Sequence, residues 1–156
     1  SPRLMDLLQA SVKQKLIVNQ LQFSIAHALM INHQFQFNML TEGAVNRSDE
    51  VLEYCRLKGI TIQAWSPFQH GFFKGTFIDN DDYKELNRVL DRIAIEKGVP
   101  KSAVVAAWIL RHPAKMQVIV GTMNARRITD ICKASDITLL REEWYEIYCA
   151  AGNILP

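Results

Sequence analysis

The sequence has no long hydrophobic segment. Its longest apolar run, residues 103–110, is far shorter than the ~20 residues that a membrane-spanning helix needs. Residues 1–4 lead directly into an amphipathic pattern, so we also expect no signal peptide. These absences argue against a membrane-embedded protein and predict that no membrane is a partner.

The sequence also has no large excess of positive or negative charge, and it has few cysteines. The net charge of +2 is spread along the chain without a basic arm or stripe, so we expect no nucleic-acid partner. Cys55, Cys132 and Cys149 are odd in number, and no pair has metal-ligand spacing. Together with scattered histidines, this pattern predicts no metal site and small buried thiols in a protein of the reducing cytoplasm.

The remaining composition is typical of a globular, soluble protein. Hydrophobic residues make up 49% of the 156 residues and charged residues 22%. Such a length is enough for one domain with a sizeable core. We therefore treat residues 1–156 as a single unit.

Hydrophobic periodicity predicts helices and strands in alternation. We expect strands at residues 16–18, 60–65 and 117–120, and a long connection with some local structure at residues 24–47. The expected helices lie after Ser1, between Ser48 and Gly59, between Asp82 and Gly98, over residues 102–111, from Ala125, and around Trp144.

Local signals refine these boundaries. Ser48 and the pair of Asp82 with Glu85 are candidate helix caps. His112 before Pro113 is most simply a histidine at a helix C-terminus, a position that the helix dipole favours. The helix after Ser1 has an apolar face that we expect to be packed, formed by Leu4, Leu7, Leu8 and Val12.

Strands that alternate with helices indicate parallel β-α units. Only three strands are expected, and a three-stranded parallel sheet has two bare edges, which folded proteins rarely leave open. The opening helix also has no strand before it. Both points indicate a piece of a larger α/β fold.

Residues 118–130 form the most informative segment, with a strand, a polar turn and a helix start. Residues 118–120 are β-branched without alternation, which suits a strand buried on both faces. Gly121 allows close backbone approach, Asn124 is a helix cap, and Arg127 adds a charged donor near free helix N–H groups. The segment fits either a phosphate contact or an ordinary strand-to-helix connection.

Three stretches in this order resemble the aldo-keto reductases. They are VNQLQFS at 18–24, IQAWSPF at 62–68 and VIVGTMNARRI at 118–128. These stretches look like the sixth, seventh and eighth strands of that family's (β/α)8 barrel with the loops that follow. AAWILRHP at 106–113 resembles the helix before the last strand, and LREEWYEIY at 140–148 resembles the C-terminal helix of a bacterial subgroup of predicted oxidoreductases.

The resemblance implies that residues 1–156 are a partial domain, the C-terminal portion of a TIM (β/α)8 barrel with its active site at the carboxyl ends of the strands. The implied reaction is hydride transfer from NADPH to a small aldehyde or ketone. The family's catalytic tyrosine, aspartate, lysine and histidine follow the early strands, and this chain has no match for them. We therefore assign no catalytic residue and expect the isolated chain to be inactive, needing the missing barrel half or self-association.

Cofactor-binding residues do carry over from the resemblance. Gln20 matches the glutamine that hydrogen-bonds the nicotinamide carboxamide, and Trp65 matches the aromatic residue on which the nicotinamide stacks. Ser66, Pro67 and Phe68 match the loop that passes the pyrophosphate. The alternatives are a buried amide satisfied by backbone, a core tryptophan and a simple strand stop.

The same matching reaches the adenosine end of the cofactor. Thr122, Asn124 and Arg127 match residues around the ribose 2′-phosphate. Gly121 stands where many members have lysine, but other members share this glycine, so NADP is expected rather than NAD. Asp130 sits where an acidic residue contacts the adenine amine, or it is a solvated helix carboxylate.

The loop after β-strand residues 60–65 is rich in aromatic residues. Phe72, Phe73 and Phe77 either line a substrate or cofactor pocket or pack the barrel rim. Because some relatives use the same barrel as a regulatory subunit, a nucleotide-sensing or interaction protein without turnover is the alternative function. A third hypothesis is a half-barrel that dimerises to close its edges.

Overall fold

The computed structural model describes residues 1–71 and 74–156, so Phe72 and Phe73 lie outside the described residues. Within these ranges three parallel strands form one sheet in the order β1-β2-β3. The parallel β-α arrangement expected from the sequence is therefore confirmed. The strands are β1 (Val18–Gln22), β2 (Thr61–Trp65) and β3 (Met116–Val118).

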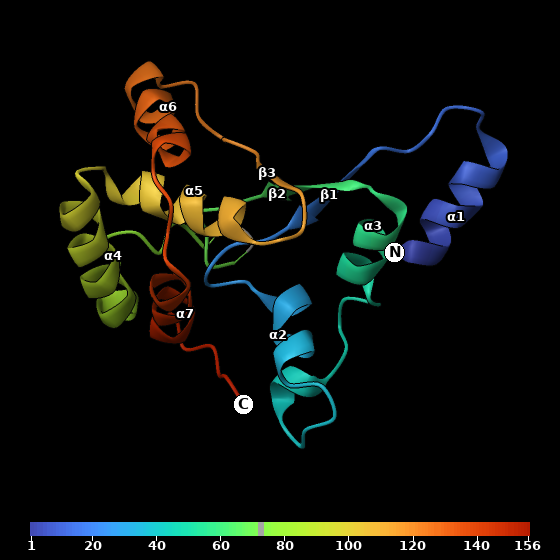
Figure 1. Ribbon diagram of the computed structural model, residues 1–156, viewed down its shortest axis with the longest axis horizontal. Coiled ribbons are helices and arrows are strands. Elements are labelled where there is room, and N and C mark those ends of the chain that lie inside the picture. The colour runs from blue at the N-terminus through green and yellow to red at the C-terminus, as the bar shows by residue number, and fades with distance from the viewer. Residues whose placement is uncertain (72–73) are drawn as a thin grey trace.

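Helices of the described chain separate and follow the strands (Figure 1). The α-helices are α1 (Pro2–Ser11), α2 (Leu29–Phe35), α3 (Val51–Lys58), α4 (Lys84–Lys97), α5 (Lys101–Arg111), α6 (Ala125–Cys132) and α7 (Arg141–Ala150). Short 3₁₀ turns lie at Glu42–Ala44, Asp81–Tyr83 and Lys133–Asp136. In Figure 1 the N-terminal helix α1 stands at one end of the molecule beside α3, and the C-terminus lies near α7 and α2.

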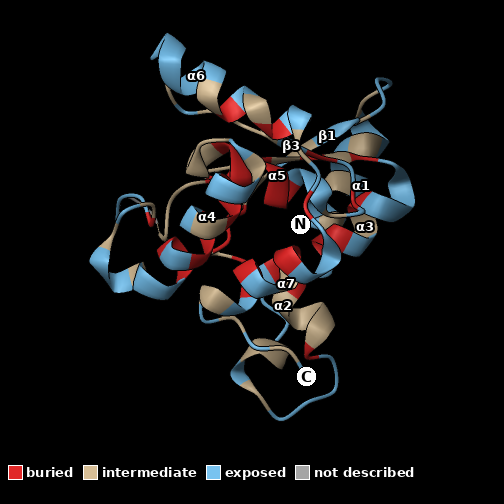
Figure 2. Ribbon diagram, turned by 60° about the vertical axis from the view of Figure 1, so that its left-hand side comes forward, coloured by how far each residue is buried: buried red, intermediate tan, exposed pale blue. Residues whose placement is uncertain are grey.

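One face of the sheet is covered by helices. Ile62 and Ala64 alternate along β2 with less buried neighbours, and both are buried toward α3 and α5. Residues 103–109 of α5 are buried throughout, which explains why this helix reads as apolar all round. Figure 2 shows burial gathered in α5, α7 and the facing side of α4.

Two tryptophans join α5 to α7 in the centre of this core. The Trp108 and Trp144 rings stack with centroids 4.8 Å apart. Trp108 Nε1 donates to the Trp144 carbonyl at 3.0 Å, and Trp144 Nε1 donates to the Trp108 carbonyl at 2.9 Å. Both buried indole N–H groups are thereby satisfied, so the pair costs no unpaired donor.

The opposite face of the sheet carries amides. Gln20, Gln63 and Gln117 are register partners on adjacent strands. Gln20 Nε2 donates to Gln63 Oε1 at 3.2 Å, and Gln63 Nε2 donates to Gln117 Oε1 at 3.0 Å. We call these three residues and Trp65, which shares their face by the two-residue strand period, the glutamine face.

The strand boundaries differ from the sequence expectation at both edges of the sheet. β1 begins at Val18 rather than at residue 16, because pairing starts where the Thr61 N–H donates to the Ile17 carbonyl at 2.9 Å. β3 ends at Val118, although Ile119 N still donates to the Ala64 carbonyl at 2.9 Å. The expectation that residues 118–120 are buried on both faces is wrong: they are half-buried, because helices cover only one face.

Two glycine-terminated helices confirm the sequence expectation, whereas the predicted caps Ser48 and Asp82 with Glu85 are wrong. Gly59 and Gly98 adopt left-handed conformations at the ends of α3 and α4, as their positions after the last apolar residue predict. Ser48 is not the cap of α3, since Glu50 occupies that position without a side-chain bond. Ser1 does occupy the N-cap position of α1 before Pro2, although its side chain makes no capping bond. The capping box is absent because Asp82 belongs to a 3₁₀ turn that precedes α4.

Residues 24–47 contain more structure than the sequence indicates. The short helix α2 lies there, with Met30 and Ile31 buried. Its seven residues are too few to establish a helical period, so the pattern reads as a loop.

Exposure is higher than expected in α1 and at two cysteines. Leu4, Leu7 and Leu8 are 64%, 65% and 50% exposed, so the predicted packed face has no partner within the described chain. Cys55 is buried as expected, but Cys132 and Cys149 are exposed and correct the prediction of buried thiols. Among the described helices, none is both long and apolar enough to cross a bilayer.

Candidate functional site

A cleft of about 690 Å³ opens at the carboxyl ends of β2 and β3. It lies between the loop that follows β2, the turn that follows β3, and the first turns of α5 and α6. Eight of the ten sequence-predicted cofactor residues line it, the exceptions being Gln20 and Asn124. The eight are Trp65, Ser66, Pro67, Phe68, Gly121, Thr122, Arg127 and Asp130.

The β2 side of the cleft begins with a left-handed residue. Ser66 has a φ of 53°, which is uncommon for a residue with a side chain and costs backbone energy. Gln69 holds this turn, because its N–H donates to the Ser66 carbonyl at 3.1 Å and its side-chain Oε1 accepts from Ser66 Oγ at 3.0 Å. Ser24 Oγ donates to the Gln69 carbonyl at 2.7 Å and ties the loop to the end of β1.

The β3 side of the cleft is a capped helix start. Asn124 Oδ1 accepts from the Arg127 N–H at 3.1 Å, which confirms the predicted cap of α6. Thr122 Oγ1 accepts from the Asn124 N–H at 3.2 Å. The Asn124 oxygen is thus occupied by the cap. The charged donor at this end of the cleft is the Arg127 guanidinium, which has no salt-bridge partner among the described residues.

Gly121 and Asp130 complete this side. A Cβ added to Gly121 would meet no atom within 4 Å of the described chain, so packing in the chain itself does not require glycine here. Asp130 Oδ1 lies 3.3 Å from Lys133 Nζ, and the ion pair offsets the charge of the half-buried carboxylate. Arg127 therefore lines the cleft beside Asp130, whose carboxylate is already paired with Lys133.

Gln20 lies outside the cleft, on the glutamine face. Its register partner is Gln63, and Trp65 lies two positions further along β2 on the same face. Gln20 and Trp65 thus share one side of the sheet although they come from different strands. The amide is held by another side chain, not by backbone as the alternative interpretation assumed.

Some lining residues gave no sequence signal. Ser102 lies in the first turn of α5, where a polar residue reads only as a helix start. Asp79 pairs with Lys101 Nζ, which also lies 3.0 Å from Asp91 Oδ1. Phe77, a candidate pocket residue, is fully buried in the core, so the rim-packing interpretation holds for it.

The described lining of the cleft has hydroxyl and carboxyl groups but no tyrosine. Each of the chain's four tyrosines lies elsewhere. Across residues 1–71 and 74–156, no group of three or more histidine, cysteine, aspartate or glutamate side chains is arranged to hold a metal ion. One polar atom near the cleft is unsatisfied: His70 Nε2 is buried in the loop after β2 without a hydrogen-bond partner in the described structure.

Comparisons with known proteins agree with this arrangement. The chain is 33% identical over 147 residues to the 6-dehydroglucose reductase of Agrobacterium fabrum, covering 94% of this chain and 42% of that protein. It is 27% identical over 153 residues to an oxidoreductase of Escherichia coli, covering 97% of this chain and 44% of that protein. The chain thus spans less than half the length of these curated relatives.

Solved structures share the fold. The aldo-keto reductase of Bombyx mori in complex with NADP superposes with a TM-score of 0.64 at 16% identity, covering 96% of this chain and 42% of that structure. The aldose reductase of Giardia lamblia gives a TM-score of 0.63 at 21% identity, covering 99% and 43%. The sequence profile described as the Aldo/keto reductase family matches residues 12–150, and the chain therefore belongs to that family.

Proposed function

We propose that this chain is the C-terminal portion of an NADPH-dependent reductase of small aldehydes or ketones, with β1 to β3 as the sixth to eighth barrel strands. It would supply much of the cofactor site and none of the catalytic tetrad. The main support is the gathering of eight predicted cofactor residues around one cleft at the carboxyl ends of the strands. That edge is where barrel enzymes of this architecture bind their ligands.

The residues present fit a dinucleotide. The cleft is roomy, it has an aromatic wall at Trp65, and it has an exposed guanidinium at Arg127. The unsatisfied His70 Nε2 beside the predicted pyrophosphate loop is a polar atom that lacks a partner. When bound, NADPH would supply the hydride for carbonyl reduction.

Each end of the site has a distinct role in the proposal. Gln20 and Trp65 would hold the nicotinamide end, because they share the glutamine face. Ser66, Pro67 and Phe68 would pass the pyrophosphate, and Arg127 would bind the 2′-phosphate with a planar, permanently charged donor. The complex of the Bombyx mori relative with NADP supports this choice of cofactor.

Charge removal at Arg127 tests the proposal in the full-length parent protein. Arg127→Ala should weaken NADPH binding about ten-fold or more, because charged hydrogen bonds contribute roughly 1.5–3 kcal/mol. NADH binding should change little, because NADH lacks the 2′-phosphate. Fluorescence titration with both nucleotides measures the difference, and Arg126→Ala, at the adjacent exposed position, is the matched control.

Equal loss of NADPH and NADH affinity in Arg127→Ala would mean that the arginine is structural. The isolated 156-residue chain should not reduce an aromatic aldehyde, because it has no match for the catalytic tyrosine that donates the proton in the family it resembles. NADPH consumption by that purified chain would overturn this part of the proposal.

The same barrel without turnover, as a nucleotide-sensing or interaction subunit, is the second candidate. The absence of a tyrosine among the described cleft residues favours it for the isolated chain. Reduction of an aldehyde by the full-length parent, followed by NADPH absorbance, separates the two. Turnover would reject the sensing role as the sole function.

The uncovered sheet requires a partner in this proposal. β1 and β3 are free edges, and the glutamine face has no helix over it in the described chain. The missing barrel half or a second copy of the chain would cover the edges and the glutamine face. We place the protein in the cytoplasm. A monodisperse monomer of the isolated chain in light scattering would contradict this need.

A further inference from the structure

A second set of arginines lies at the other end of the sheet from the cleft. Arg56 is in the last turn of α3 and Arg111 in the last turn of α5, so both precede the amino ends of the strands. With Arg141, the first residue of α7, they line a pocket of about 300 Å³. We call this pocket, walled by Trp144 and Tyr145, the arginine pocket.

The positive charge in the arginine pocket is not balanced by acids. Within the described structure, none of its three arginines makes a salt bridge, and Arg111 uses only Nε, which donates to the Leu139 carbonyl at 3.1 Å. No carboxylate is among the described residues that line the pocket, and Glu143 contacts Lys97 and the Leu140 N–H instead.

A neutral donor and aromatic rings complete the pocket. His112 Nδ1 accepts from the Ala114 N–H at 3.1 Å, which leaves the proton on Nε2. Burial, reinforced by the charge of Arg56, lowers the pKa of His112 to about 4, so this ring is neutral at physiological pH. The Trp144 and Tyr145 rings meet edge to face, with centroids 5.1 Å apart, and form an angled apolar wall.

Helix dipoles explain only part of this cluster. Cations are favoured at helix C-termini, which accounts for Arg56 and Arg111. Arg141 opens α7, where the dipole is positive and a cation is disfavoured. The helix dipoles therefore do not account for all three guanidinium groups around this pocket.

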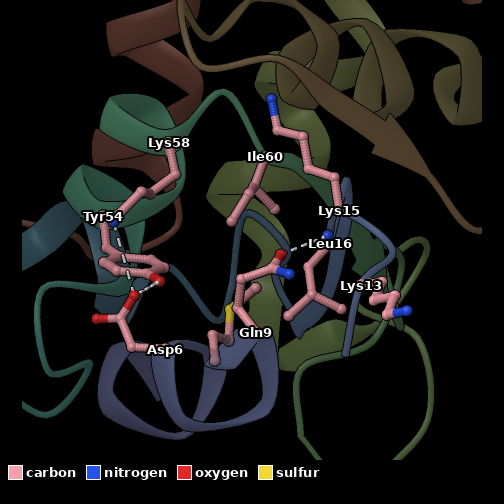
Figure 3. Close-up of a pocket in the computed structure, with 9 residues that line it drawn as sticks. Asp6, Gln9, Lys13, Lys15, Leu16, Tyr54, Lys58 and Ile60 are labelled. Carbon is pink, nitrogen blue, oxygen red and sulfur yellow. Dashed lines mark hydrogen bonds and ion pairs between the residues drawn. The ribbon is translucent and has the colours of Figure 1, made fainter. Parts of the chain in front are cut away.

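A second basic hollow, between α1 and α3, provides the contrast (Figure 3). That hollow has a carboxylate in its lining: Lys58 Nζ lies 3.6 Å from Asp6 Oδ1, and Tyr54 Oη donates to the same oxygen at 2.5 Å. Figure 3 shows Lys13 and Lys15 pointing away from this group. The contacts of Asp6 with Tyr54 and Lys58 tether α1, which has no buried residue, whereas no carboxylate is among the described residues that line the arginine pocket.

We propose that the arginine pocket binds a small phosphate monoester, with its phosphate on the guanidiniums and its organic part against the aromatic wall. Guanidinium forks match phosphate oxygens in bidentate pairs, and three cations suit a dianion. The site lies apart from the proposed cofactor cleft and does not depend on it.

Titration of the full chain with phenyl phosphate, followed by amide NMR, tests the site. Saturable shifts are expected at the backbone amides of Arg141 and Trp144. Arg141→Gln should weaken binding about ten-fold or more. Arg126→Gln, an exposed arginine outside both sites, is the matched control and should leave the affinity unchanged.

Four outcomes would overturn the proposal. Binding could fail to saturate, it could fall equally in Arg126→Gln and Arg141→Gln, or it could be lost in Arg127→Gln and retained in Arg141→Gln. The last result would assign the phosphate to the cofactor cleft. Tighter binding of benzoate than of phenyl phosphate would also overturn it, since the proposal requires a dianion; thermal unfolding of each variant checks that it is folded.

Discussion

The two faces of the sheet differ in chemistry: one has buried apolar side chains and the other has glutamine side chains. On the helix-covered face Ile62 and Ala64 are buried under α3 and α5, and the tryptophan pair closes the layer behind them. On the glutamine face three amides bond to one another across the strands, and Gln20 and Gln117 are exposed. The same strands therefore carry stability on one side and hydrogen-bonding groups on the other.

This difference indicates a division of tasks. Burial of apolar area stabilises the chain at about 25 cal/mol per Å², and it is concentrated on the covered face. Bonds between exposed amides contribute little, because water competes for them. The glutamine face thus positions hydrogen-bonding groups, while burial on the covered face stabilises the fold.

The largest effect is expected from the covered face. Trp108→Ala should lower the free energy of unfolding by about 3–5 kcal/mol, because it leaves a large cavity. It also removes the donor to the Trp144 carbonyl and the stacking partner of its ring. Urea denaturation followed by circular dichroism measures the loss, and a cost below that of Gln63→Ala would contradict the division between the faces.

An intermediate effect is expected from the pH dependence of the helical layer. The pKa of His112 is held at about 4, below its ordinary 6.5, first by burial and then by Arg56. Between these values the unfolded chain binds more protons than the folded chain, so stability should fall as the pH is lowered from about 6.5 to 4. The half-buried His27, whose pKa is also lowered by burial, contributes in the same direction.

His112→Gln should flatten this part of the stability curve, measured by urea denaturation at several pH values. His33→Gln, on α2, is the control and should leave the His112 contribution in place. An unchanged slope in His112→Gln would mean that the folded state admits the proton without cost.

The smallest effect is expected on the glutamine face. Gln63→Ala removes two hydrogen bonds that are accessible to solvent, so it should cost less than about 1 kcal/mol in the isolated chain. In the full-length parent, where the proposal places these amides inside the barrel, the same change should cost more. An equal loss of unfolding free energy in both proteins would mean that the glutamine face remains exposed to solvent in the parent.

The sequence predicted elements whose signals are local. α4 has Leu86, Val89 and Leu90 buried as its period requires, and Gly98 ends it. The Asn124 cap was also predictable, because it depends on residues within one turn. Such features need no knowledge of the rest of the fold.

Features set by distant contacts were not predictable in the same way. The start of β1 depends on pairing with Thr61, and the exposure of Leu4 depends on what lies beside α1. In the site, the resemblance identified the lining residues at Trp65 and Arg127, but no pattern indicated that Gln63 would hold Gln20. A one-dimensional period cannot reveal which strands become neighbours.

The amide lining of the sheet also affects how the molecule can be divided. An apolar barrel interior cut in two would expose large hydrophobic surfaces and favour aggregation. Here the uncovered face of the sheet presents glutamines that can bond to water or to a facing partner. If the chain is part of a barrel, as proposed above, a surface of this kind suits complementation in trans by the remaining strands.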